Sequence, residues 1–131
     1  MPIPDPYGAH PSGARARRAC GRHLVAVAQL SVDAIETYSG WRLGIAGELD
    51  LSTAPILVAE LDHVLERTDS IEIDLSRVSF MDSQGLGVLL RAESEVPGRS
   101  FTVVDASPQA RRLLAVTGLA NHFGLPPLPE A

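Results

Sequence analysis

The spacing of hydrophobic residues changes from strand-like to helix-like within the stretch 71–90. Over 71–75, isoleucine and leucine alternate with acidic residues, the period-two pattern of a strand with one covered and one solvated face. Leucines at 86, 89 and 90 then recur at helical spacing. The pattern predicts a strand over 71–75, a polar turn over 82–84, and a helix over 83–96 that Pro97 and Gly98 stop.

The same pattern, followed along the whole chain, predicts that strands and helices alternate after an opening hairpin. Further strands are expected over 24–38, 41–46 and 101–105, with a short edge strand over 123–125. Further helices are expected after Ser52 or Thr53, either of which can cap, and over 108–117. This order predicts an α/β fold, a mixed four- to five-stranded sheet with helices packed on one face. Alternating rather than continuous hydrophobic strands indicate that the other face is open.

Ser83 is expected at or beside the N-cap of the helix that follows it. The simplest interpretation is that Asp82 or Ser83 only caps this helix. The first amides of a helix also favour negative charge, so a phosphate on Ser83 would be tolerated there. Gly85 and Gly87 each cost about 1 kcal/mol relative to alanine inside a helix and need a reason. Two reasons are open: close packing on the neighbouring strand, or a bare surface that lets a partner approach Ser83.

Three segments resemble the STAS domains of bacterial anti-sigma-factor antagonists, over about residues 24–125. They are FMDSQGLGVLL (80–90), GELDLSTAP (47–55) and SPQARRLLAVTGL (107–119). The resemblance implies a STAS-like fold and phosphorylation of Ser83 by an anti-sigma factor that is also a serine kinase. Many members carry a second small hydroxyl residue where this chain has Gln84, so a single phosphate acceptor is expected in the turn. The partner-binding residues implied are Asp50, Ser52, Thr53, Asp82, Ser83, Gln84, Gly85 and Leu86.

The function expected from this resemblance is that of an anti-sigma-factor antagonist. Unphosphorylated, it would bind the anti-sigma factor and free a sigma factor; phosphorylated on Ser83, it would not, and a phosphatase is a further candidate partner. An interaction module in a stress-signalling scaffold or a transport complex is the alternative. A small hydrolase that uses Ser83 is a third hypothesis, but G-x-S-x-G is absent and no histidine is close in sequence. We therefore expect no enzyme activity and no cofactor.

Charge is distributed unevenly along the 131 residues, and every basic residue other than histidine is arginine. Residues 1–22 hold four arginines against one aspartate, whereas the remainder holds seven arginines against fifteen acidic residues. An acidic domain argues against direct nucleic-acid binding. The composition predicts a disordered basic arm over 1–22, the STAS domain over 23–125 and a proline-rich tail over 126–131. Pro126, Pro127 and Pro129 leave no residues for the additional C-terminal helix that many family members carry.

The remaining sequence signals point to a cytoplasmic protein without a metal site. No apolar run approaches the roughly 20 residues that span a bilayer, and no signal peptide is visible. Cys20 stands alone, which excludes an internal disulfide. No histidine pairs at metal-ligand spacing with another ligand, and His63 is expected to face solvent on the first helix.

Overall fold

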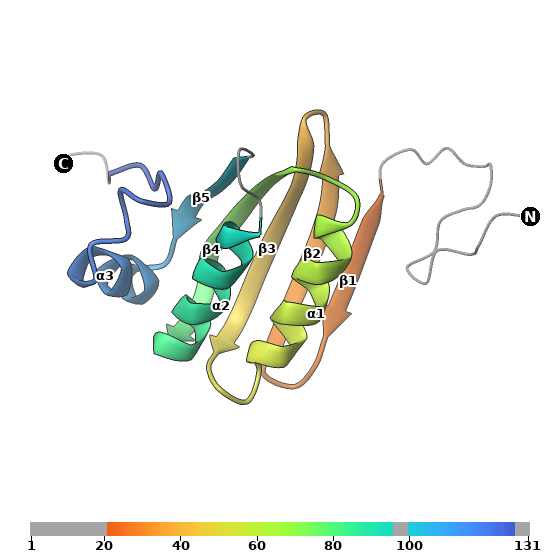
Figure 1. Ribbon diagram of the computed structural model, residues 1–131. Helices are drawn as coiled ribbons and strands as arrows, with labels where there is room; N and C mark the ends of the chain where they lie inside the picture. Colours follow the sequence, from red (N-terminus) through yellow and green to blue (C-terminus); the bar gives the residue numbers. More distant parts are fainter. Residues whose placement is uncertain (1–20, 96–99, 128–131) are drawn as a thin grey trace, which may run out of the picture.

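Five strands lie side by side in the order in which they occur in the sequence, β1-β2-β3-β4-β5 (Figure 1). The computed structural model describes residues 21–95 and 100–127. β1, β2 and β3 pair antiparallel, and β3, β4 and β5 pair parallel, so the predicted mixed sheet is confirmed. The strands are β1 (Arg22–Ala26), β2 (Leu30–Thr37), β3 (Gly40–Leu49), β4 (Ser70–Met81) and β5 (Ser100–Ala106). The helices are α1 (Ala54–Leu65), α2 (Ser83–Ser94) and α3 (Pro108–Val116).

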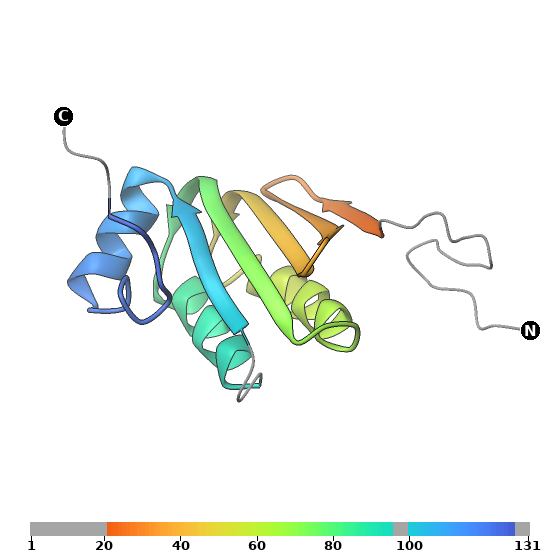
Figure 2. The same cartoon turned by 90° about the horizontal axis from the view of Figure 1, so that it is seen from above.

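Two helices, α1 and α2, cover one face of this sheet, and α3 lies at the β5 edge (Figures 1 and 2). The core lies between the sheet and the two covering helices, because alternate strand residues point toward them and are buried. On β3 these are Trp41, Leu43 and Ile45, while Arg42 and Gly44 point to the opposite face. The helix-free face that strand alternation predicts is therefore present.

The predicted first strand over 24–38 is wrong in one respect, because it is two strands. β1 and β2 form an additional hairpin, closed at Val27, whose N–H donates to the carbonyl oxygen of Leu30 (2.9 Å). Residues 27–29 read Val-Ala-Gln and carry no glycine, proline or asparagine, so no turn signal marks the break. β1 begins at Arg22, within the range predicted as an arm; residues 1–20, with His10 and Cys20, lie outside the described residues.

The expected outward position of His63 is also wrong, because β1 adds an edge strand beside α1. His63 is buried, and its ring centroid lies 6.0 Å from that of His23 on β1. His23 Nδ1 in turn lies 2.8 Å from Oε1 of Glu60, a buried carboxyl group on α1. The sequence pattern does not predict β1 as a separate strand. It therefore leaves this side of α1 uncovered and His63 exposed.

The expected edge strand over 123–125 is a turn, although it does cover the sheet edge. The Val103 N–H of β5 donates to the Phe123 carbonyl oxygen (2.9 Å), and the Phe123 side chain is buried against the core. The chain reverses into this position at Gly118 and Gly124, both of which have positive φ, a region that glycine enters without strain. The proline-rich tail from residue 128 and the helix stop at 97–98 lie outside the described residues.

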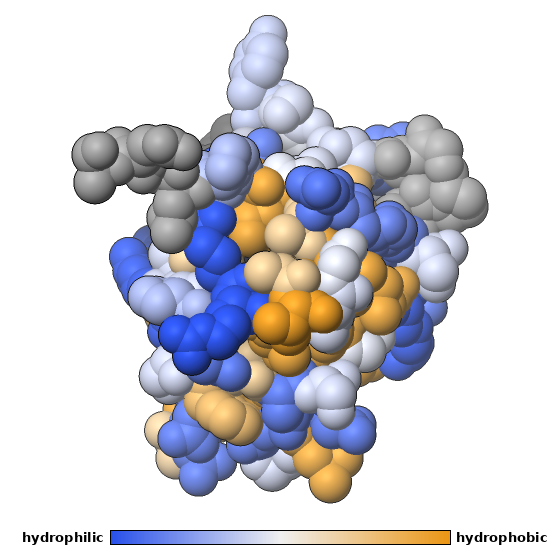
Figure 3. All heavy atoms as spheres, turned by 90° about the vertical axis from the view of Figure 1, so that its left-hand side faces the viewer, coloured by the Kyte–Doolittle hydropathy of each residue, from blue (hydrophilic) through white to orange (hydrophobic). Residues whose placement is uncertain are grey.

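Hydrophobic residues also gather on the side of the molecule where α3 lies, with hydrophilic residues around them (Figure 3). Val116 on α3 is one of the large hydrophobic side chains that remain exposed.

Within the described ranges, no helix is long and apolar enough to cross a membrane. The same residues contain no group of three or more histidine, cysteine or acidic side chains arranged to hold a metal ion.

Candidate functional site

The predicted site residues come together where β3 and β4 end. Leu49, the last residue of β3, pairs in register with Met81, the last residue of β4. The Asp82 N–H then donates to the Leu49 carbonyl oxygen (3.3 Å), so the loop after β3 and the start of α2 lie side by side. Since both strands are parallel, their carboxyl ends meet at one edge of the sheet, where open α/β sheets place functional groups.

Asp82 is the N-cap of α2, which resolves the choice between Asp82 and Ser83. Its backbone is extended (φ −119°, ψ −171°), and its Oδ1 accepts from the Gln84 N–H (2.9 Å) and the Gly85 N–H (3.3 Å). Ser83 is the first helical residue, it is exposed, and its hydroxyl makes no hydrogen bond within the described residues. The Ser83 hydroxyl is therefore available at the positive end of a helix whose amides Asp82 partly satisfies.

Gly85 and Gly87 have different surroundings. A Cβ at Gly85 would lie 2.7 Å from Leu49 Cγ and 2.9 Å from the Leu49 carbonyl oxygen, closer than real Cβ contacts. Only glycine lets α2 pack this tightly on the end of β3, which confirms close packing as the reason for Gly85. A Cβ at Gly87 would meet nothing within 4 Å, and Gly87 is exposed.

The loop after β3 is held by hydrogen bonds around Asp50. Asp50 Oδ1 accepts from the Ser52 hydroxyl (2.8 Å), the Ser52 N–H (3.0 Å) and the Thr53 N–H (3.2 Å). The Ser52 hydroxyl, and then the backbone amides of Thr53 and Ser52, hold the pKa of Asp50 below its ordinary value by stabilising the charged form. The loop therefore presents an ionised carboxylate beside the Ser83 turn.

Neither hydroxyl that was expected to cap α1 does so. Thr53 occupies the N-cap position, but its side chain makes no cap hydrogen bond. It is buried, and its Oγ1 instead donates to the Glu48 carbonyl oxygen (2.7 Å) and accepts from the Asp50 N–H (3.0 Å). The Ala54 N–H, one of the first amides of α1, donates to the Asp50 carbonyl oxygen (2.8 Å). Local backbone geometry in the loop replaces a side-chain cap.

The structure divides the eight predicted partner-binding residues into two groups. Ser52, Ser83 and Gln84 are exposed, and Asp50 and Asp82 are partly so. The other three, Thr53, Gly85 and Leu86, are buried and shape the surface from beneath.

Gln109 on α3 is a site residue that the hydrophobic pattern did not single out. Its Oε1 accepts from the Met81 N–H and its Nε2 donates to the Met81 carbonyl oxygen, both at 2.8 Å. β5 pairs with β4 only as far as Leu75, so this side of β4 lacks a strand partner near Met81. The side-chain amide replaces one, immediately before Asp82 and Ser83. A glutamine near a helix start is too common in sequence to predict such a contact.

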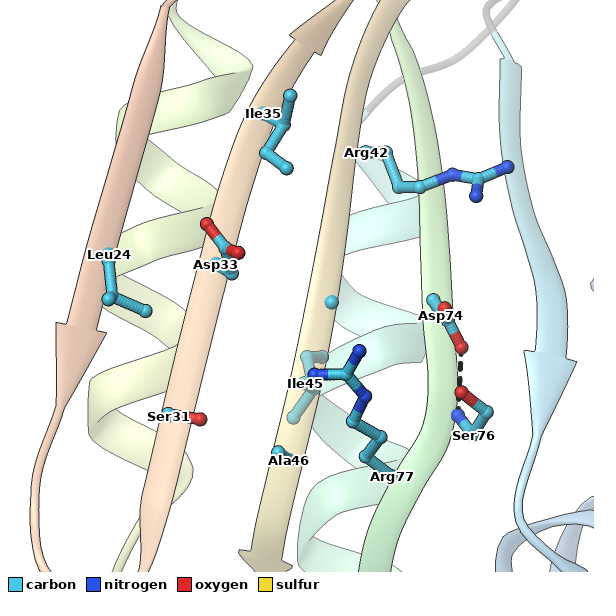
Figure 4. A pocket seen from close by; sticks show the side chains of 11 residues that line it. Leu24, Ser31, Asp33, Ile35, Arg42, Ile45, Ala46, Asp74, Ser76 and Arg77 are labelled. Carbon is cyan, nitrogen blue, oxygen red and sulfur yellow. Dashed lines mark hydrogen bonds between the residues drawn. The ribbon is translucent and has the colours of Figure 1, made fainter.

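The helix-free face of the sheet holds a separate hollow of about 370 Å³ (Figure 4). Gly44 on β3 is among its lining residues, with Asp33 on β2 and Asp74 on β4 in register on either side. Asp33 is bound by Arg22 through two hydrogen bonds of 3.0 and 2.9 Å, and Asp74 accepts from the Ser76 N–H (2.9 Å). Within the described residues, no hydrogen bond or ion pair joins Asp33 or Asp74 to the Ser83 turn.

The chemistry available at the Ser83 turn is that of an exposed hydroxyl without an activating base. Within the described residues, no histidine hydrogen-bonds to Ser83, and a serine nucleophile needs such a partner. The turn can instead present its hydroxyl, two carboxylates and a glycine-lined backbone to another macromolecule.

Comparisons with known proteins identify relatives that carry the same fold. A family model described as "Mlab, STAS domain" matches residues 36–128. The anti-sigma-B factor antagonist of Bacillus subtilis (strain 168) is 35% identical over 94 residues, which cover 70% of this chain and 86% of that protein. The anti-sigma-F factor antagonist RsfB of Mycobacterium tuberculosis is 40% identical over 86 residues, covering 63% and 70% respectively.

Solved structures agree with these matches. The crystal structure of an anti-sigma factor antagonist from Mycobacterium paratuberculosis aligns with a TM-score of 0.71 and 30% identity, over 80% of this chain and 92% of that one. The anti-sigma factor antagonist SpoIIAA in its unphosphorylated form aligns with a TM-score of 0.60 and 22% identity, covering 83% and 89%, a likeness of fold alone.

Proposed function

The chain belongs to the STAS domain family, among its anti-sigma factor antagonists, and from this premise we propose that phosphorylation of Ser83 controls its binding to an anti-sigma factor. Members of this family are regulatory proteins rather than enzymes, so the hydrolase hypothesis for Ser83 is set aside. The observation that carries the proposal is the state of Ser83: exposed, without a hydrogen-bond partner in the described residues, and first in α2.

In the proposed cycle, the unmodified protein docks on an anti-sigma factor that is also a serine kinase. Docking uses the edge where β3 and β4 end and releases a sigma factor to RNA polymerase. The partner then phosphorylates Ser83 and dissociates, and a phosphatase resets the serine. We place the cycle in the cytoplasm, because that is where a bacterial sigma factor meets RNA polymerase.

The proposed effect of the phosphate is local. It adds about −1.5 to −2 charges beside Asp82. The helix N-terminus accepts this charge, so α2 needs no rearrangement. A coupling of about 1–3 kcal/mol, or about 5–150-fold in affinity, is enough for a switch. Burying a hydrated dianion next to an existing carboxylate opposes binding by at least that order.

Co-purification from the native host tests the proposal with Ser83→Ala, Ser83→Asp and a matched control, Ser94→Asp. Ser94 is exposed at the other end of α2, so the control adds the same charge far from the turn. We expect a kinase-fold protein to be recovered with Ser83→Ala and Ser94→Asp but not with Ser83→Asp. Mass spectrometry of the wild-type chain should find phosphate on Ser83.

Recovery of the same proteins with all three variants would contradict the proposal. Ser83 would then be only the first residue of a helix, and the alternative of a scaffold or transport module would take its place. Stable association with membrane-transport subunits, without a kinase-like protein, would support that alternative.

A further inference from the structure

We propose that Leu51 and Phe80 are the apolar anchors with which this chain docks on its anti-sigma factor, both at the sheet edge that holds the Ser83 turn. This inference rests on the proposed function, since the partner is the same. It adds two residues that lie inside the segments carrying the resemblance but are not among the eight expected partner-binding residues.

Both side chains are exposed although they are large and hydrophobic. Leu51 is 69% exposed and Phe80 is 45% exposed. Leu51 lies two residues beyond the end of β3, and Phe80 is the last but one residue of β4. Because Glu48 pairs with Phe80 and Leu49 with Met81, both anchors lie at the edge that holds Asp82 and Ser83.

The backbone holds Leu51 in place without using its side chain. Asp50 Oδ1 accepts from the N–H of Ser52, the residue after Leu51. Thr53 Oγ1 accepts from the Asp50 N–H and donates to the Glu48 carbonyl oxygen. These contacts fix the loop on both sides of Leu51 while its side chain stays exposed. An anchor that is ordered before binding loses little conformational entropy when it docks.

Phe80 is fixed in a similar way by its neighbours on β4. The next residue, Met81, is held on one side by β3 and on the other by the two 2.8 Å hydrogen bonds from Gln109. The backbone next to Phe80 is therefore fixed by hydrogen bonds, and the Phe80 ring stays exposed. Aromatic residues, phenylalanine among them, are enriched in protein interfaces relative to the rest of the protein surface.

Charge near the anchors indicates what the partner must present. Residues 47–56 and 78–90 contain three acidic residues, Glu48, Asp50 and Asp82, and neither arginine nor histidine. A complementary surface has an apolar recess for each anchor, with lysine or arginine at the rim to face these carboxylates. We assign that surface to the anti-sigma factor, beside the site where it receives Ser83.

Apolar anchors also explain how one phosphate can release the partner. Burying Leu51 and Phe80 requires water to leave the edge where β3 and β4 end, and Ser83 lies at the same edge. A phosphoserine dianion stays hydrated and so opposes the same dehydration. Binding through the anchors therefore requires a contact from which water is excluded, and phosphorylation of Ser83 prevents that contact from forming.

Matched variants test the anchors, with the anti-sigma factor recovered by the Ser83→Ala form as the titrant. We expect Leu51→Ser and Phe80→Ser each to weaken its binding at least about fivefold, the loss typical of an interface anchor. The controls are Leu24→Ser, at 56% exposure on β1, and Tyr38→Ser, fully exposed where β2 turns into β3. Both controls remove similar apolar surface away from the edge and should bind as the parent does. Thermal unfolding of each variant shows that it is folded, and Leu51→Ser, in a loop, tests the proposal even if Phe80→Ser is destabilised.

Failure of the inference is distinguishable from failure of the proposed function. If Ser83→Asp abolishes binding while Leu51→Ser and Phe80→Ser bind like their controls, the anchors are wrong and the switch stands. If the controls weaken binding as much as the anchor variants, the effect is general and the inference is again overturned. If Ser83→Asp binds like Ser83→Ala, the switch is wrong, and an anchor effect then reports docking without phosphorylation control.

Discussion

At the scale of single residues, neighbouring polar side chains in the Ser83 turn have separate tasks. Asp82 accepts from two amides at the start of α2, whereas the Ser83 hydroxyl accepts and donates nothing within the described residues. Sequence alone left the cap open between the two, because both residue types are common at that position. Only the backbone conformation shows which of them precedes the helix.

We expect this division to appear in stability. Asp82→Ala should lower the free energy of unfolding by about 1 kcal/mol, since two amides lose their acceptor. Ser83→Ala should change it by less than about 0.5 kcal/mol, as for an exposed residue without contacts. Urea unfolding of both variants measures the difference. An equal loss in the two would mean that Ser83 contributes to the cap.

Gln109 and Thr53 show where prediction from sequence ends at this scale. The resemblance placed Thr53 in the docking surface, but it lies buried beneath that surface and bonds the loop backbone. Gln109 contacts Met81 across 28 positions of sequence. Such contacts depend on β4 continuing beyond the last residue that pairs with β5. No local sequence pattern indicates this.

At the scale of elements, helix α2 carries two glycines with opposite consequences. Gly85 lies against Leu49 of β3, and Gly87 faces open space. The sequence showed that two glycines in one helix needed a reason, and the structure supplies packing for one of them. The exposed one leaves a bare helix surface one turn beyond Ser83.

Substituting alanine at each glycine should give changes of opposite sign. Gly85→Ala should destabilise the fold by about 1–3 kcal/mol, because the added methyl meets the Leu49 side chain and carbonyl oxygen. Gly87→Ala should stabilise it by up to about 1 kcal/mol, the helix preference of alanine over glycine. Thermal or urea unfolding measures both. Destabilisation by Gly87→Ala would contradict the open position assigned to it.

Element prediction succeeded where hydrophobic periodicity was strong and failed where a boundary had no signal. All three helices and the strands β3, β4 and β5 lie where the pattern placed them, within a few residues except for β4, which continues to Met81. The pattern does not separate β1 from β2, because Val27 and Ala28 continue the apolar run and residues 27–29 contain no glycine, proline or asparagine. That one error also misplaced His63, since β1 is the strand that lies beside it.

At the scale of the whole molecule, the sheet is closed at the β5 edge by the chain that follows α3. Phe123 is buried, and its ring centroid lies 5.9 Å from that of Phe101. Its carbonyl oxygen accepts a hydrogen bond from the Val103 N–H of β5. A free sheet edge promotes association with other chains, so this cover has a protective effect. The sequence pattern predicts a short edge strand over 123–125, whereas the structure has a turn there.

We expect Phe123→Ala to destabilise the molecule by about 3–5 kcal/mol, as for a phenylalanine removed from a packed core. Tyr38→Ala, at the exposed turn between β2 and β3, should cost almost nothing. Urea unfolding gives both values, and light scattering should show aggregation of Phe123→Ala first. A cost below about 1 kcal/mol would mean that the turn does not secure the edge.

The strictly sequential strand order has a consequence for synthesis of the protein. Each strand pairs with the one that precedes it in the chain, so synthesis delivers the strands in the order in which they lie in the sheet. The turn around Phe123 is translated after β5, and until it emerges the newest edge of the nascent sheet has nothing over it. A chain that ends between β5 and this turn therefore lacks the cover of the β5 edge, and an uncovered sheet edge promotes association with other chains.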